Sequence, residues 1–167
     1  MLFFVGDFWL LVFIFEVMEV IRATILDIPL LLPLFDRYRQ FYEMSSDLKA
    51  CEEFLMERFR KEEGVVFIVV EEQNGETVGL GFSMMCITFS TIGLKKFWSL
   101  HDLYVEEEYR KQGIAKLLIN KCKELAIEYN PLGIVIESRI SNQSAQHLFD
   151  SVSFVKEGEH YFYYLED

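Results

Sequence analysis

The sequence has few of the residues that build metal sites, disulfide frameworks or anion-binding surfaces. Its three cysteines, Cys51, Cys86 and Cys122, are far apart, and no Cys or His pair has zinc-ligand spacing. The 16 basic residues are outnumbered by 27 acidic ones, which gives a formal charge of −11. Nucleic acids and anionic membranes bind basic surfaces, so we expect neither as a partner, and no metal. The acidity suits a cationic ligand or solubility alone, and unpaired cysteines predict a cytoplasmic location.

Lysine and arginine are absent from the first seventeen residues, which are almost wholly apolar. A signal peptide would have a positive start, and a spanning helix would have about twenty apolar residues, whereas Asp7 and Glu16 interrupt this segment. Because Met18 opens a natural first strand, we expect residues 1–17 to lie outside one domain of residues 18–167. We interpret the segment as an over-extended reading frame; a membrane anchor or an extra strand is the alternative.

Linkers, internal repeats and low-complexity segments are also missing, which predicts one mixed α/β (α+β) domain. Strands are predicted over residues 19–24, 65–70, 77–90, 97–105 and 134–136, with closing strands at 155 and 161–165. Helices are predicted from the Asp27 cap through Tyr42, from the Ser45–Asp47 cap to about Lys61, from Ile114 to Tyr129, and from Ser141 or Asn142 to Val152. Pro33 is expected to break or restart the first helical segment, and Gly64 to end the second helix. Asn74-Gly75 predicts a hairpin, and Gly79 and Gly81 predict a bulge.

The most informative stretch lies between the strand ending at Val105 and the helix that begins at Ile114. The first turn of a helix has N–H groups without intrahelical partners and favours negative charge. Gly113 lets the backbone approach an anion closely because it has no Cβ. The pattern Arg-x-x-Gly-x-Ala therefore predicts a pyrophosphate site. Its residues are Arg110, Lys111, Gln112, Gly113, Ile114, Ala115 and Lys116.

Two motifs at this separation resemble the GCN5-related N-acetyltransferase (GNAT) superfamily. They are Leu103-Tyr-Val105 followed by Tyr109-Arg-Lys-Gln-Gly113-Ile-Ala115, and Asn142-x-x-Ala145-x-x-Leu148-Phe149 with Phe154 downstream. The resemblance extends in element order from about Glu19 to Asp167. It implies a GNAT-like single domain with a mixed central sheet of about six to seven strands flanked by four helices. It also implies an acetyl-CoA-dependent N-acetyltransferase.

The resemblance further implies which residues bind acetyl-CoA. They are the strand end Leu103, Tyr104 and Val105, the turn of residues 110–116, and Asn142, Ala145 and Phe149. Many members carry a Tyr as general acid where this chain has Phe149, which cannot donate a proton, so we expect Phe149 to pack in the core. Tyr161, Tyr163 and Tyr164 are then the candidates for protonating the thiolate. Ser153 stands where the family commonly has Gly.

The proton acceptor is expected at His101 or Asp102. Polyamine-type members often place a carboxylate four residues before the Val of the Leu-x-Val element, and that position is His101 here. Strand alternation groups His101 with Leu103 and Asp102 with Leu100 and Tyr104, so the two cannot face one cleft equally. Histidine titrates near neutrality and suits the role, directly or through a water. A structural hydrogen-bonding role is the alternative for each residue.

Substrate recognition is expected at Tyr38, Tyr42 and Glu43, because aromatic rings beside carboxylates suit an alkylammonium group. Core packing is the alternative for these aromatic residues. The predicted reaction is direct attack by a primary amine of a small cationic metabolite, such as a polyamine, an amino sugar or a lysine-like compound. A protein or peptide N-acetyltransferase and a non-catalytic acyl-CoA-binding module are the alternatives, and a homodimer would be common for the family.

Overall fold

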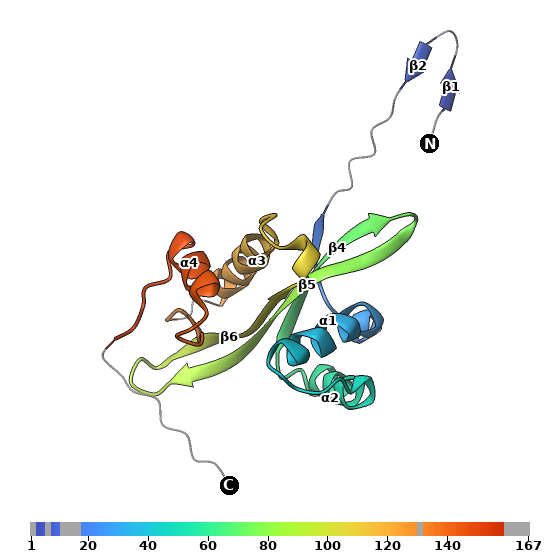
Figure 1. The fold of residues 1–167 in the computed structure, drawn as a ribbon. Helices are drawn as coiled ribbons and strands as arrows, with labels where there is room; N and C mark the ends of the chain where they lie inside the picture. Colours follow the sequence, from blue (N-terminus) through green and yellow to red (C-terminus); the bar gives the residue numbers. More distant parts are fainter. Residues whose placement is uncertain (1–2, 6–7, 11–17, 130–131, 159–167) are drawn as a thin grey trace.

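The computed structural model describes residues 3–5, 8–10, 18–129 and 132–158 (Figure 1). The strands are β1 (Phe3–Val5), β2 (Phe8–Leu10), β3 (Glu19–Arg22), β4 (Val65–Gln73), β5 (Glu76–Ser90), β6 (Lys95–Val105) and β7 (Ile134–Ile136). The helices are α1 (Ile28–Phe41), α2 (Leu48–Lys61), α3 (Ile114–Glu128) and α4 (Gln143–Ser151), with short 3₁₀ turns at Ile25–Asp27 and Glu107–Tyr109.

A five-stranded sheet in the order β3-β4-β5-β6-β7 forms the centre of the domain. Its neighbours are antiparallel except for β6 and β7, which are parallel. Among the described residues, the central sheet thus has slightly fewer strands than the six to seven that we predicted for it. Residue 155 lies outside any strand, and residues 161–165 lie outside the described residues. The mixed α+β architecture with four helices is confirmed.

The helices divide between the two faces of the sheet (Figure 1). Helices α1 and α2 cover one face, where Leu31, Leu34 and Leu55 are completely buried against Ile68 and Phe82. Helices α3 and α4 cover the other face. There the buried cluster comprises, among others, Val69, Leu80, Met85, Trp98, Leu100, Ile114, Leu118, Ile119 and Val152. The domain therefore has one apolar core on each side of the sheet.

Two of the predicted backbone features of the β4–β5 pair are confirmed. Asn74 and Gly75 form its turn with φ values of 53° and 83°, as a tight hairpin with two positive φ angles requires. The register shifts between Val69, which pairs with Gly81, and Val70, which pairs with Gly79, so the residue between the two glycines is a bulge. A Cβ at Gly81 would lie 2.6 Å from the carbonyl oxygen of Tyr104, so this close approach of β5 to β6 requires glycine.

The predicted break of the first helix at Pro33 is wrong. Pro33 lies inside α1, near its N-terminal end. A proline there removes only one backbone hydrogen bond, and we infer that the burial of Leu31, Leu34 and Phe35 offsets that loss. Asp27 precedes the helix as expected, but its carboxylate accepts hydrogen bonds from Thr24 at the preceding 3₁₀ turn.

Helix α2 ends at Lys61, as predicted, but the terminating residue is not Gly64. Glu62 is the C-cap and takes the left-handed conformation with φ 52°. Gly64 has a different role, since a Cβ there would lie 2.8 Å from the carbonyl oxygen of Met85. The start of the helix agrees with the prediction, because the Asp47 carboxylate accepts a 3.0 Å hydrogen bond from the Ala50 N–H.

The N-terminal strands β1 and β2 pair with each other and do not join the five-stranded sheet. Among the helices that the structure describes, none has both the length and the apolar character needed to cross a membrane.

Candidate functional site

One edge of strand β6 is open where the strand ends. Its parallel pairing with β7 stops at Leu100, which is opposite Ile136, whereas β6 continues to Val105. In the described part of the chain, no strand pairs with Leu103–Val105 on that side, although β5 pairs with them on the other. Backbone N–H and C=O groups on an open strand edge can pair with an extended ligand. The strand end is therefore able to receive an extended chain as an additional strand.

The turn that follows this strand presents backbone N–H groups at the start of α3. Gly113 is the N-cap with φ 89°, and the first intrahelical bond runs from the Leu117 N–H to the Gly113 carbonyl at 3.1 Å. The N–H groups of residues 113–116 therefore have no intrahelical acceptor. A Cβ at Gly113 would meet no atom within 4 Å, so the space above the turn is open. This geometry fits an anionic group such as a pyrophosphate.

Two side chains hold the turn in place, one against the end of β6 and one against the preceding 3₁₀ turn. Arg110 donates from Nε to the Val105 carbonyl at 3.0 Å, and its guanidinium carbon lies 5.9 Å from the ring centroid of Tyr104. Gln112 donates from Nε2 to the Glu108 carbonyl at 3.2 Å. Arg110 thus braces the turn against the strand, while Lys111 and Lys116 are exposed beside the helix start.

A second register shift places both candidate proton acceptors on the same side of the sheet. Met84 pairs with Asp102 and Met85 with Leu100, so His101 is the extra residue of a β-bulge. Leu100 packs with the α3 side of the core, and Asp102 lines a pocket on the α1–α2 side. The prediction that Asp102 shares a face with Leu100, and that His101 and Asp102 face opposite ways, is wrong, because the bulge interrupts the alternation.

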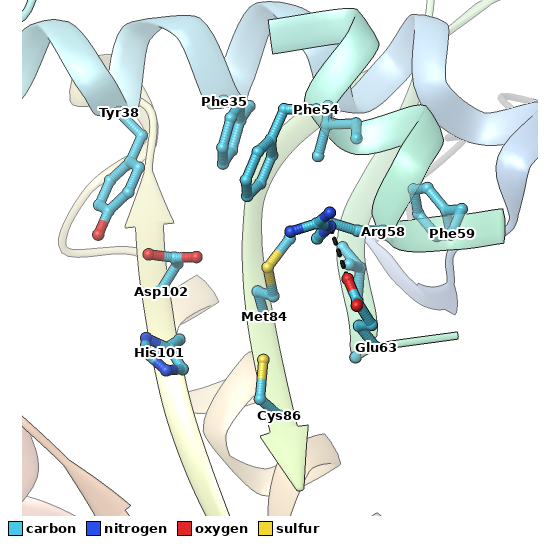
Figure 2. A pocket seen from close by; sticks show the side chains of 13 residues that line it. Phe35, Tyr38, Phe54, Arg58, Phe59, Glu63, Met84, Cys86, His101 and Asp102 are labelled. Atoms are coloured by element: carbon cyan, nitrogen blue, oxygen red, sulfur yellow. Dashed lines mark ion pairs between the residues drawn. The ribbon is translucent and has the colours of Figure 1, made fainter. Parts of the chain in front are cut away.

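The pocket lies between α1, α2 and strands β4 to β6 and has a volume of about 490 Å³. In Figure 2, Tyr38, Asp102 and His101 form one side and Arg58 and Glu63 the other. The remaining lining residues are Phe35, Phe54, Leu55, Phe59, Gly64, Val66, Met84 and Cys86. The pocket is therefore mainly apolar with ionisable groups at both sides.

Burial changes the proton affinity of several groups in the pocket. It raises the pKa of Asp102 above its usual value, while hydrogen bonding with Tyr38 and the charge of His101 act in the opposite direction. Burial also raises the pKa of Tyr38, with a further contribution from Asp102. The pKa of the Cys86 thiol is raised by burial, then by Asp102 and Glu63. Asp102 is thus a stronger base than an exposed aspartate.

The predicted substrate residues do not all reach this pocket. Tyr38 lines it, whereas Tyr42 and Glu43 do not. The Tyr42 ring packs edge-on against Tyr38 with centroids 5.1 Å apart, and the guanidinium of Arg139 lies 4.8 Å from its centroid. Glu43 is exposed with φ 66°.

Helix α4 contributes residues with structural contacts. The Asn142 side chain accepts a 3.1 Å hydrogen bond from the Ala145 N–H and caps the helix. Phe149 packs against the α3 side of the core and against Phe154, with centroids 5.9 Å apart, as expected from its place in the apolar seam. Ser153 has φ 68°, which explains why glycine suits this position. Tyr161 lies outside the described residues.

Sequence analysis did not identify the pocket residues contributed by α2, β4 and β5. Arg58 and Phe54 flank the apolar seam of α2, and Glu63 and Gly64 follow the helix. Their common location depends on how α2 packs over β4 and β5, which has no local sequence signal. In the described residues, no three His, Cys, Asp or Glu side chains gather as they would around a metal ion.

Comparisons with known proteins agree with this fold. The profile of the acetyltransferase (GNAT) family matches residues 31–154. An uncharacterized N-acetyltransferase of Bacillus subtilis, YhfO, is 32% identical over 133 residues, which are 80% of this chain and 87% of that protein. A probable acetyltransferase of Haemophilus influenzae is 32% identical over 107 residues, 64% of this chain and 71% of that protein.

Solved structures show the same fold. The crystal structure of a probable acetyltransferase has a TM-score of 0.82 and 33% identity, covering 89% of this chain and 97% of that one. An aminoglycoside N-acetyltransferase in complex with CoA has a TM-score of 0.76 at 17% identity, covering 93% and 99%. The chain belongs to the acetyltransferase (GNAT) family and is an N-acetyltransferase.

Proposed function

We propose that this chain transfers the acetyl group of acetyl-CoA to a primary amine of a small cationic metabolite. The observation that carries the proposal is the β-bulge at His101. It directs Asp102 into the pocket, while the same strand ends three residues later, at Val105, in an open edge beside the turn that precedes α3. An amine in the pocket and an extended donor along the strand end would therefore meet at β6.

The open edge and the turn fit acetyl-CoA in two respects. Its pantetheine arm can pair with the backbone of Leu103–Val105, and its pyrophosphate can accept hydrogen bonds from the amides of residues 113–116. Lys111 and Lys116 add positive charge beside the same amides. When bound, acetyl-CoA supplies a thioester carbonyl that a neutral amine can attack.

Asp102 is suited to hold the ammonium group and to take up its proton. Because burial raises its pKa, the carboxylate binds a proton more readily than an exposed one, while its hydrogen bond with Tyr38 favours the ionised form. Tyr38 is itself fixed by edge-on packing against Phe82 and Tyr104. The exposed His101 at the pocket can pass the proton on to solvent. Proton acceptance of this kind contributes roughly 10²–10⁴-fold to a rate.

The lining of the pocket supports a cationic acceptor. Phe35, Phe54 and Tyr38 offer aromatic surface next to the Asp102 carboxylate, a combination that binds alkylammonium groups. The acidic chain as a whole attracts cations. A polyamine, an amino sugar or a lysine-like compound meets these requirements.

The proposal is tested by measuring CoA release from acetyl-CoA in the presence of an amine panel, with a thiol reagent. We expect amine-dependent turnover, and a kcat/KM roughly 10²–10⁴-fold lower for Asp102→Asn. Calorimetric titration with acetyl-CoA is the control, because the variant keeps the strand edge and the turn and should bind the donor normally. Absence of saturable acetyl-CoA binding, or turnover with peptides but with no small amine, would contradict the proposal.

A further inference from the structure

We propose that the acceptor carries a carboxylate as well as the amine, joined by a short aliphatic chain, and that Arg58 binds this carboxylate. The inference rests on the proposed function, because it assigns the two ends of the same acceptor pocket. It narrows the acceptor to amino acids whose reacting amine is remote from the carboxylate.

The two polar sides of the pocket differ in charge, because one carries the Asp102 carboxylate and the other carries the Arg58 guanidinium beside the Glu63 carboxylate. Asp102 lies on β6, and Arg58 is the only Lys or Arg among the described residues that line the pocket. Figure 2 shows Met84 and Cys86 of β5 between these two sides, with Phe35 and Phe54 over them. A molecule that spans the pocket thus meets a carboxylate, an apolar middle and a guanidinium in turn.

The separation of the two sides suits a linear aliphatic chain. Asp102 pairs with Met84, and Met84 pairs with Val66, so the pocket crosses three adjacent strands. Neighbouring strands are about 4.8 Å apart, so the outer strands are about 10 Å apart. The pocket volume of about 490 Å³ leaves room for several methylene groups, which the apolar middle can bury.

The guanidinium of Arg58 is held in place but has donors to spare. Its central carbon lies 4.9 Å from the Phe54 ring centroid, and Nη2 contacts Glu57 at 2.8 Å. Nε lies 2.7 Å from a carboxylate oxygen of Glu63, without the alignment of a hydrogen bond. Arginine has five N–H donors, so the remaining Nη hydrogens can bind a substrate carboxylate. The side chain is 30% exposed, which leaves it accessible from the pocket.

Three probes of matched length test the inference, each with acetyl-CoA in the CoA-release assay. They are ε-aminocaproate, n-hexylamine and hexamethylenediamine, which place a carboxylate, a methyl group or a second ammonium at the far end. We expect ε-aminocaproate to have the highest kcat/KM. Replacing Arg58 with Met keeps the contact with Phe54 but removes the charge. It should raise the KM for ε-aminocaproate roughly 10- to 100-fold and leave the KM for n-hexylamine unchanged.

Glu63→Gln is the second variant, and it guards against a loss of folding in Arg58→Met. It frees the guanidinium from one partner, so the KM for ε-aminocaproate should stay the same or fall. Equal kcat/KM values for ε-aminocaproate and n-hexylamine would overturn the inference and leave the proposed amine acetylation intact. Preference for hexamethylenediamine that Glu63→Gln abolishes would overturn it in favour of a diamine site. Turnover with none of the three probes would count against the proposed function as well.

Discussion

Deletion of His101 should be tolerated, although the residue lies inside a strand of the central sheet. A one-residue deletion in a strand normally moves every following side chain to the opposite face. Here the pairs Met84–Asp102 and Met85–Leu100 flank His101, so its removal converts a bulged ladder into a regular one without altering a pair. The pairing with β7 ends at Leu100 and is also unaffected. The side chain of His101 is exposed, so few packing contacts are lost.

We expect this deletion to cost about 1 kcal/mol, which lowers the melting temperature by about 2–4 °C in a domain of this size. Deletion of Leu103 is the matched control. No β-bulge lies at Leu103, so its deletion would move the buried side chains of Tyr104 and Glu106 to the opposite face of the sheet. Misplacing a large buried side chain alone costs about 3–5 kcal/mol, a large part of the total stability of a domain.

Thermal unfolding followed by circular dichroism compares the two deletions. Similar large losses of melting temperature for both would refute our account of the bulge. If the variant that lacks His101 folds, Asp102 still faces the pocket. The turnover of this variant in the CoA-release assay then distinguishes the two candidate proton acceptors. Retained turnover would assign the proton to Asp102, and a roughly 10²–10⁴-fold loss would assign it to His101.

Three further predictions concern single side chains. Gly113 and Gly75 have φ values of 89° and 83°, and a Cβ at either would meet no atom within 4 Å. Replacing either one with Ala should therefore lower the free energy of unfolding by about 1–2 kcal/mol, measured by thermal unfolding. Only Gly113→Ala should also weaken acetyl-CoA binding, measured by calorimetry. Ser153→Gly should raise the stability by about 1 kcal/mol, because φ 68° suits glycine, and an unchanged melting temperature would contradict this. Asp36→Asn should cost about 1–3 kcal/mol in denaturant unfolding at neutral pH, with a smaller difference below about pH 4.

The pH dependence at Asp36 follows from its buried contacts. Burial raises the pKa of this carboxyl, but hydrogen bonds from Ser46, the Asp47 N–H and Gln40 at 2.7, 2.9 and 2.8 Å outweigh burial and hold the pKa below its usual value. A folded-state pKa below the unfolded one means that the ionised group stabilises the fold above the unfolded pKa. This contribution is lost as the pH falls through the folded pKa. A difference between wild type and Asp36→Asn that stays constant down to pH 3 would contradict this reasoning.

Local signals in the sequence were sufficient for most of the elements. Some features depend only on residues within a few positions of one another, so they can be predicted without the fold. Examples are the Asn74-Gly75 turn, the Asp47 cap and the apolar run of β4. The same holds for Gly113, whose left-handed conformation and helix start are set by the turn itself. The predictions at Pro33 and Gly64 failed because they depend on tertiary contacts. Packing on the sheet keeps α1 continuous through Pro33, and the close carbonyl of Met85 explains the glycine at position 64.

By itself, then, the sequence determined the order of strands and helices, the turn at Gly113 before α3 and membership of an acetyltransferase family. Only the tertiary structure decided which way Asp102 faces, because the β-bulge at His101 is defined by the register with β5 and no glycine near His101 indicates it. The tertiary structure also decided that Arg58 of α2 and Glu63, which follows this helix, lie opposite Asp102 across the same pocket. Such contacts join residues far apart in the chain, and their spacing arises from how the helices pack over the sheet.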